Sequence, residues 1–172
     1  FCYPDAAVRP LLDAFAARPE PWRVLVPRGV APQAAGHPVA VPVPFVPQAD
    51  YDRLLWSCDL NFVRGEDSLV RAHWAERPFV WQLYPQDARA QQPKLDAFLD
   101  IFLPGLDQEA ADRVSSFWQW WNADAPQDGL PDWPAMCAAL PGWAAHARNW
   151  ARKVASAGEL SRSIVEFASK IR

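Results

Sequence analysis

The chain has 172 residues and a formal net charge of −3, which allows one domain with a substantial core and gives no sign of nucleic-acid binding. No apolar stretch reaches the length of a membrane span, because Pro, Arg, Asp or Gln interrupts each candidate. The three cysteines (Cys2, Cys58 and Cys137) are odd in number and far apart, so we expect neither a disulfide framework nor a zinc site. A reducing cytoplasm fits this cysteine usage better.

The first residues, Phe1-Cys2-Tyr3-Pro4, resemble the end of an aromatic-rich strand that a proline turn closes. Neither an initiator methionine nor a charged leader before an apolar segment occurs there, so we do not expect a signal peptide. We expect the chain to be the C-terminal part of a larger protein. Part of any active site would then lie outside it.

Short apolar runs alternate with short helical patterns in the first half of the chain. Strands are predicted at 22–26, 60–63 and 78–85, with an edge strand or extended segment at 39–46, where prolines argue against a central strand. Helices are predicted to carry residues 8–15, 50–56 and 69–76. This alternation predicts an α/β fold over residues 1–93, with a Rossmann-like parallel sheet covered by helices on both faces.

The remainder of the chain, residues 94–172, is predicted to be mostly helical, with breaks near Gly142 and Gly158. Three tryptophans at 118, 120 and 121 suggest stacking on a carbohydrate. At helical spacing, however, such clusters more often fill a core or a domain interface, which is the interpretation we favour.

Residues 59–68, with the sequence D-L-N-F-V-R-G-E-D-S, form the most informative stretch. An apolar strand pattern ends at Arg64, and Gly65, Glu66, Asp67 and Ser68 follow before a helical pattern. Ligands of α/β proteins bind at such strand ends, beside helix N-termini. Arg64 can grip a phosphate, Gly65 permits close backbone approach, and Asp67 or Ser68 can cap the helix. A capped helix with a surface ion pair explains these residues equally well.

Two further strand ends carry candidate ligand-binding residues. Phe45-Val46-Pro47-Gln48 precedes a predicted helix, so Phe45 could stack on a base and Gln48 could read the base edge; a core phenylalanine before a helix is the alternative. Tyr84 and Gln86 follow the strand at 78–85. Because parallel strands end on the same sheet edge, we expect the three strand ends to converge on one crevice.

Motifs for other chemistries are missing from the sequence. No Walker A, G-x-G-x-x-G or G-x-S-x-G motif occurs, and the three histidines have no carboxylate or cysteine companion at ligand spacing. We therefore predict neither a metal nor a cofactor.

Four segments together resemble a known family: F-C-Y-P at 1–4, F-V-P-Q at 45–48, D-L-N-F-V-R-G-E-D-S at 59–68 and R-P-F-V-W-Q-L-Y-P-Q at 77–86. They are similar to the C-terminal half of the EarP family, the protein-arginine rhamnosyltransferases of elongation factor P. The resemblance spans essentially the whole chain. It implies a GT-B glycosyltransferase whose C-terminal domain holds the donor, dTDP-β-L-rhamnose, and whose last helix returns to the N-terminal domain in many enzymes of that fold.

The resemblance also implies roles for individual residues. Phe45 would stack on the thymine and Gln48 would recognise its edge, while Tyr3 would line the donor pocket. Arg64, Ser68 and Tyr84 would bind the diphosphate, Asp67 would organise the loop or contact the ribose, and Glu66 would face the sugar or the reacting centre. Gln86 joins this set by its position alone.

The family transfers rhamnose with inversion and without a metal, and its general base is an Asp of the N-terminal domain. Nothing in this chain corresponds to that Asp, so we expect the chain to bind the donor without catalysing transfer alone. The missing N-terminal domain and elongation factor P would be its partners. Two alternatives stay open: a non-catalytic nucleotide-sugar-binding regulatory module, and a structural interaction domain that uses the Trp-rich helices as its partner surface.

Overall fold

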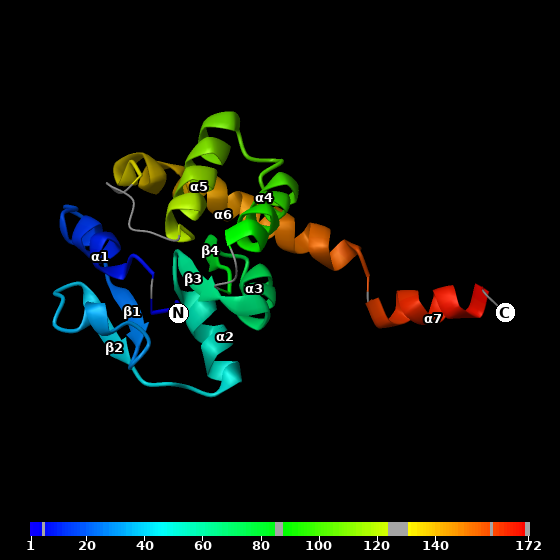
Figure 1. The fold of residues 1–172 in the computed structure, drawn as a ribbon, viewed down its shortest axis with the longest axis horizontal. Helices are drawn as coiled ribbons and strands as arrows, with labels where there is room; N and C mark the ends of the chain where they lie inside the picture. Colours follow the sequence, from blue (N-terminus) through cyan, green and yellow to red (C-terminus); the bar gives the residue numbers. More distant parts are fainter. Residues whose placement is uncertain (5, 85–87, 124–130, 159, 171–172) are drawn as a thin grey trace.

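A computed structural model describes residues 1–4, 6–84, 88–123, 131–158 and 160–170. The predicted α/β organisation with a helical C-terminal part is confirmed (Figure 1). The elements along the chain are α1 (Val8–Ala16), β1 (Val24–Pro27), the short 3-10 helix η1 (Pro32–Ala34), β2 (Ala40–Val43), α2 (Gln48–Ser57), β3 (Asn61–Arg64), α3 (Gly65–Trp74), β4 (Phe79–Gln82), α4 (Ala88–Phe102), α5 (Gln108–Trp121), α6 (Trp133–Ser156) and α7 (Leu160–Lys170).

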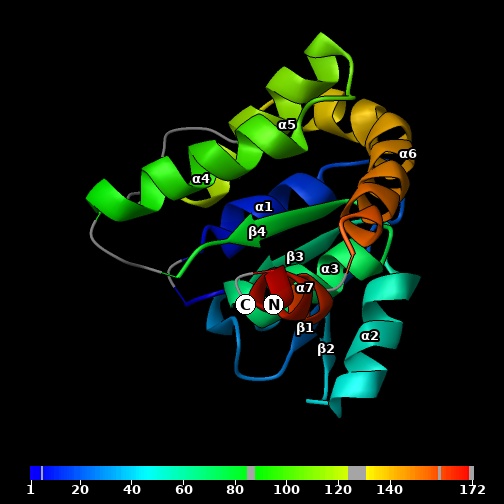
Figure 2. The same cartoon turned by 90° about the vertical axis from the view of Figure 1, so that its right-hand side faces the viewer.

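All four strands of the described chain pair in parallel, as predicted, but they form two two-stranded sheets and not the single sheet that the sequence suggested. β1 pairs with β2, and β3 pairs with β4 with Arg64 opposite Gln82. A helix lies between β3 and β4 in the chain, which is the crossover that parallel pairing requires. Figure 2 shows α4 and α5 on one side of the β3–β4 sheet and α2 on the opposite side.

The predicted strand end at residues 1–3 is wrong, because these residues form no strand. The Phe1 amino group donates a 2.9 Å hydrogen bond to the Phe62 carbonyl, but the Tyr3 amide donates to the side chain of Gln82, at 2.7 Å. A strand needs successive backbone partners, and here a side chain takes the place of one. The start of the chain therefore lies alongside β3 without forming a ladder.

Helix α3 begins at Gly65, four residues before the predicted start at Leu69. Gly65 has a φ of 67°, a conformation that glycine adopts without steric cost, and the chain turns there directly from β3 into the helix. Arg64 occupies the N-cap position and makes no side-chain capping hydrogen bond. The predicted caps at Asp67 and Ser68 are therefore wrong: both residues lie within the first turn.

Helix α6 passes through Gly142 without a break, contrary to prediction. One face of this helix buries Met136, Trp143 and Trp150, and this continuous packing outweighs the low helix propensity of a single glycine. The break at Gly158 is confirmed, since α6 ends at Ser156 and Gly158 has a φ of 79°.

The three tryptophans of α5 belong to the core. Trp118 is fully buried, and Trp120 and Trp121 are 6% and 3% exposed. Trp118 stacks on Phe98 of α4 at a centroid distance of 5.4 Å. The core interpretation is thus confirmed, and these side chains offer a surface neither for a sugar nor for a partner protein.

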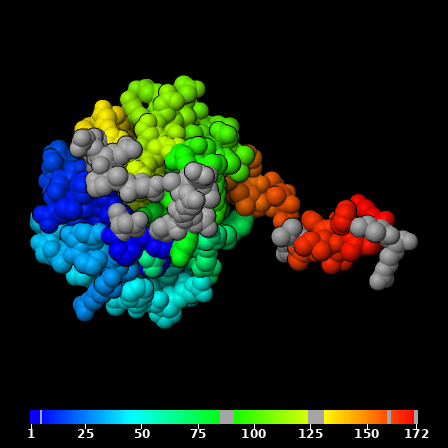
Figure 3. All heavy atoms as spheres, in the orientation of Figure 1, coloured from blue at the N-terminus to red at the C-terminus, as the bar shows by residue number. Residues whose placement is uncertain are grey.

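Helix α7 projects away from the rest of the molecule (Figures 1 and 3). Its apolar residues Ile164, Val165 and Phe167 are exposed. None of the described helices combines the length and the apolar character that a membrane crossing requires.

Candidate functional site

Arg64 ends strand β3 and lies between two aromatic rings. Its Cζ is 4.2 Å from the ring centroid of Phe1 and 4.7 Å from that of Tyr3, and its Nη1 donates a 2.9 Å hydrogen bond to the Cys2 carbonyl. Both rings make cation–π contacts that hold the guanidinium in place. Because a guanidinium carries five N–H donors, one bond to Cys2 leaves donors for an anionic ligand.

Two exposed aromatic residues extend this cluster on either side. The ring of Phe45, 67% exposed, meets Phe1 edge-on at a centroid distance of 6.4 Å. The ring of Tyr84, 57% exposed, meets Tyr3 edge-on at 5.7 Å. A continuous series of contacts therefore joins Phe45 to Arg64 and Arg64 to Tyr84. The three predicted strand ends therefore lie close together, although β2 belongs to a different sheet from β3 and β4; the crevice between them stays a prediction.

The first turn of α3 borders this cluster and carries the remaining candidates. The leading amides of a helix have no partner within the helix and form its positive end, so those at the start of α3, Glu66 and Asp67 among them, favour a negatively charged ligand nearby. Glu66 and Asp67 have exposed side chains, whereas Ser68 is buried, with 9% exposure. The Ser68 amide pairs within the helix, with the carbonyl of the N-cap Arg64, so any role of Ser68 toward a ligand depends on its hydroxyl.

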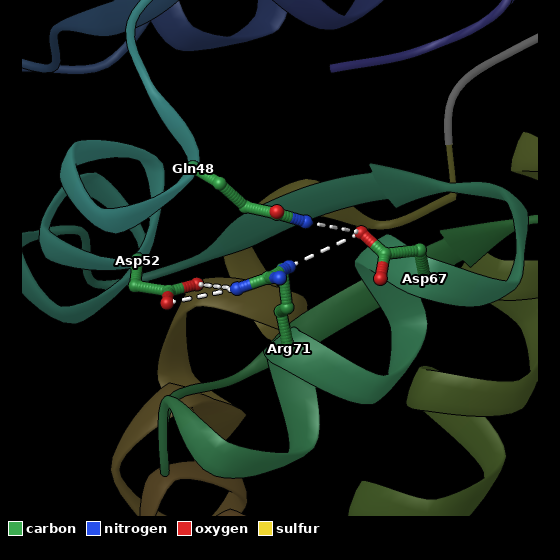
Figure 4. A network of polar contacts seen from close by, with 4 residues as sticks. All are labelled: Gln48, Asp52, Asp67 and Arg71. Atoms are coloured by element: carbon green, nitrogen blue, oxygen red, sulfur yellow. Dashed lines mark hydrogen bonds and ion pairs between the residues drawn. The ribbon is translucent and has the colours of Figure 1, made fainter.

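Gln48 belongs to a polar network that joins α2 to α3 (Figure 4). Its Nε2 donates to Oδ2 of Asp67 at 3.1 Å, and the same oxygen accepts from Nε of Arg71, also at 3.1 Å. Nη1 of Arg71 lies 2.8 Å from both carboxylate oxygens of Asp52. Asp67 thus orients Gln48, whose Oε1 has no hydrogen-bond donor among the described residues and can accept one from a base edge.

Glu66 pairs with a lysine that the sequence patterns did not single out. Lys94 of α4 places its Nζ 3.0 Å from Oε1 of Glu66. The hydrogen bond from Lys94 lowers the pKa of Glu66, so this carboxylate is ionised at neutral pH.

Two buried residues of β4 hold the backbone of the site in place, and the sequence patterns did not single them out. Gln82 accepts the Tyr3 amide through Oε1, and Trp81 donates through Nε1 to the Gly65 carbonyl, at 3.1 Å. The one signal in the sequence was a glutamine inside an otherwise apolar strand. Gln86, a predicted ligand-binding residue, lies outside the described residues.

A cavity of about 420 Å³ lies between β1 and β3, and Phe1, which contacts Arg64, is among its lining residues. Mostly apolar side chains line it, and Tyr3, Phe45, Arg64 and Tyr84 do not. Within the ranges that the structure describes, no three His, Cys, Asp or Glu side chains are grouped to hold a metal ion.

Comparison with known proteins identifies relatives over nearly the whole chain. A family model described as the elongation factor P (EF-P) rhamnosyltransferase EarP matches residues 1–169. A protein-arginine rhamnosyltransferase of Pseudomonas putida is 38% identical over 97% of this chain and 48% of its own length. The corresponding protein of Pseudomonas aeruginosa is 43% identical over 73% of this chain and 33% of its own length.

A solved structure shares the fold. It comes from work on the structural basis of EarP-mediated arginine glycosylation of translation elongation factor EF-P, and it matches with a TM-score of 0.83 and 35% identity. The match covers 99% of this chain and 59% of that one. The chain thus spans about half the length, or less, of the curated relatives named above.

Proposed function

The chain belongs to the EarP family of elongation factor P rhamnosyltransferases, and from this premise we propose that it is the donor-binding part of an inverting protein-arginine rhamnosyltransferase with a GT-B fold. The donor is dTDP-β-L-rhamnose and the acceptor is an arginine of elongation factor P. One observation carries the proposal: Arg64 is held between Phe1 and Tyr3, beside the N-terminus of α3, with exposed aromatic rings on both sides.

The nucleoside binds at the Phe45 end of the cluster. Phe45 is exposed and can stack on the thymine, since an aromatic ring stacks on the flat face of any base. Gln48, held by Asp67, presents its amide to the edge of the same base. Tyr3 closes the inner side of the pocket.

The diphosphate binds around Arg64. Negative charge develops on the diphosphate as the bond to the sugar breaks, and hydrogen-bond donors or cations are needed to stabilise it. Arg64, the hydroxyls of Tyr84 and Ser68 and the leading amides of α3 supply such hydrogen-bond donors without a metal. Asp67 acts on this group indirectly, as the partner of Gln48 and Arg71.

The sugar lies at the Glu66 end of the site, opposite the base. Transfer also requires a general base for the arginine of the acceptor, because a protonated guanidinium is a very poor nucleophile. We propose that this base belongs to the other domain of the enzyme, and that elongation factor P binds across both. The exposed Ile164, Val165 and Phe167 of α7 suit a helix that packs on that other domain. A cytoplasmic location is part of the same proposal.

Isothermal titration calorimetry tests the donor site directly. The chain is titrated with dTDP-β-L-rhamnose, and UDP-glucose serves as the competing nucleotide sugar. We expect saturable binding that favours the thymidine donor and that Arg64→Ala weakens by at least about tenfold. Arg152→Ala is the matched control, because Arg152 is an exposed arginine of α6 that hydrogen-bonds only Asn149 among the described residues.

Two results would contradict the proposal. Equal affinity for both nucleotide sugars would contradict the preference for a thymidine donor. Unchanged binding in Arg64→Ala would contradict the placement of the donor site at Arg64. Donor binding together with rhamnose transfer by the chain alone would refute the placement of the base in another domain. Binding without any effect of Glu66→Gln on transfer by the complete enzyme would favour a regulatory nucleotide-sugar-binding module.

A further inference from the structure

Lys94 reaches the donor edge from an element that carries none of the predicted site residues. It lies in α4, and its Nζ is 3.0 Å from Oε1 of Glu66 in the first turn of α3. The two side chains are 45% and 67% exposed, so both are accessible from the edge where the candidate residues converge.

A second contact restrains the lysine. Its Nζ lies 5.3 Å from the ring centroid of Trp81, a buried residue of β4. Trp81 in turn donates through Nε1 to the Gly65 carbonyl. Lys94 and Trp81 therefore hold two consecutive residues, Gly65 by its backbone and Glu66 by its carboxylate.

This arrangement is not explained by folding stability, because an exposed ion pair adds little to it. Its main consequence is positional. An unpaired glutamate at a helix start can adopt several rotamers. The ion pair to Lys94, which lies over the ring of Trp81, favours the Glu66 rotamers that point toward α4. The carboxylate then occupies one place relative to the diphosphate donors of Arg64.

We propose that Lys94 is a positioning residue for sugar transfer: it holds the Glu66 carboxylate in the orientation that the reacting sugar requires. The proposal rests on the donor site proposed above. It differs from a direct role in phosphate binding, because Lys94 acts through Glu66 and contributes little to the affinity for the nucleotide itself.

The experiment compares Lys94→Gln with the parent in the complete enzyme. We expect kcat to fall about tenfold, since misplacing a group at a reacting centre costs rate, while the Kd for dTDP stays within about twofold. Lys94→Arg, which keeps the charge and the ring contact, is expected to restore most of the rate. In a Glu66→Gln background, Lys94→Gln is expected to have no further effect.

Lys153→Gln is the matched control. Lys153 also lies over a tryptophan, with its Nζ 5.2 Å from the ring centroid of Trp150, but on α6 and without a carboxylate partner among the described residues. We expect this variant to match the parent in kcat and in nucleotide affinity.

Three outcomes would overturn the proposal. A loss of dTDP affinity in Lys94→Gln would make Lys94 a phosphate ligand. Additive effects of Lys94→Gln and Glu66→Gln would show that Lys94 acts independently of Glu66. An unchanged kcat would show that Lys94 has no role in transfer. Failure of the parent enzyme to bind the donor would instead refute the proposed function, so the two failures are distinguishable.

Discussion

Gln48 donates a 3.1 Å hydrogen bond through Nε2 to Oδ2 of Asp67, and this bond ties the start of α2 to the first turn of α3 (Figure 4). The two residues are 19 positions apart in the chain. The contact unites a predicted base-reading residue with a predicted loop organiser. Asp67 therefore orients Gln48 while it also pairs with Arg71.

Replacing Asp67 by alanine tests this relationship. We expect Asp67→Ala to weaken donor binding about tenfold in calorimetry, because Gln48 loses the partner that orients its amide. The free energy of unfolding should change by less than about 1 kcal/mol, since the ion pair with Arg71 is exposed on its Asp67 side. Asp50→Ala is the control: Asp50 pairs with Arg53 at 2.9 Å, also on α2. Equal affinities for the two variants would show that Gln48 needs no such partner.

Gly65 and Gly142 form a matched pair for backbone strain. Gly65 has a φ of 67°, and an added Cβ would lie 3.4 Å from the Tyr3 hydroxyl. Gly65→Ala should therefore lower the free energy of unfolding by about 1–2 kcal/mol. Gly142 lies within α6 with open space around it, so Gly142→Ala should raise stability by up to about 1 kcal/mol. Urea denaturation measures both, and a stabilising Gly65→Ala would contradict the conformation of the turn.

Burial of His73 makes the stability of the fold depend on pH. Burial lowers the pKa of His73 from 6.5 to about 4, and Trp150 donates to its Nδ1 at 2.9 Å. The unfolded chain therefore binds more protons than the folded chain between these two values, so stability falls as the pH falls through this window.

The melting temperature, measured from neutral pH down to about pH 4.5, should decline less steeply in His73→Gln than in the parent. Glutamine does not titrate and still offers an acceptor to Trp150. Some decline should remain, because burial also lowers the pKa of His146. Identical slopes for the variant and the parent would show that His73 makes no contribution.

Asn122 joins the end of β4 to α5 through three hydrogen bonds. Its Oδ1 accepts the Leu83 amide at 2.9 Å, and its Nδ2 donates to the carbonyls of Trp81, at 2.9 Å, and Trp118, at 3.0 Å. Asn122→Ala leaves the Leu83 amide and the Trp81 carbonyl without this partner, while the Trp118 carbonyl still accepts from the backbone amide of residue 122, so the free energy of unfolding should fall by about 3 kcal/mol. Asn149→Ala, at an exposed site, should change it by less than about 0.5 kcal/mol. Chemical denaturation of both variants decides between a structural and a neutral role for Asn122.

Local sequence patterns were sufficient to predict the helices and strands that bury one regular face. The alternation of apolar runs and helical segments predicted the parallel strands, and the spacing of Trp118 and Trp121 predicted a core helix. Glycines were less reliable guides: Gly158 separates two helices, whereas Gly142 lies inside one. Packing along a continuous apolar face decides between these outcomes, and a single residue type does not reveal it.

The sequence by itself determined the family, the parallel α/β pattern and the strand ends at Phe45, Arg64 and Tyr84, because these depend on residue type and short-range order. Only the tertiary structure decided that α3 starts at Gly65, that Asp67 orients Gln48 and that Lys94 reaches Glu66. Lys94 and Glu66 are 28 positions apart, and no local period relates them. Their contact depends on how α4 and α3 lie around β4, since long-range packing places side chains that the local sequence leaves free.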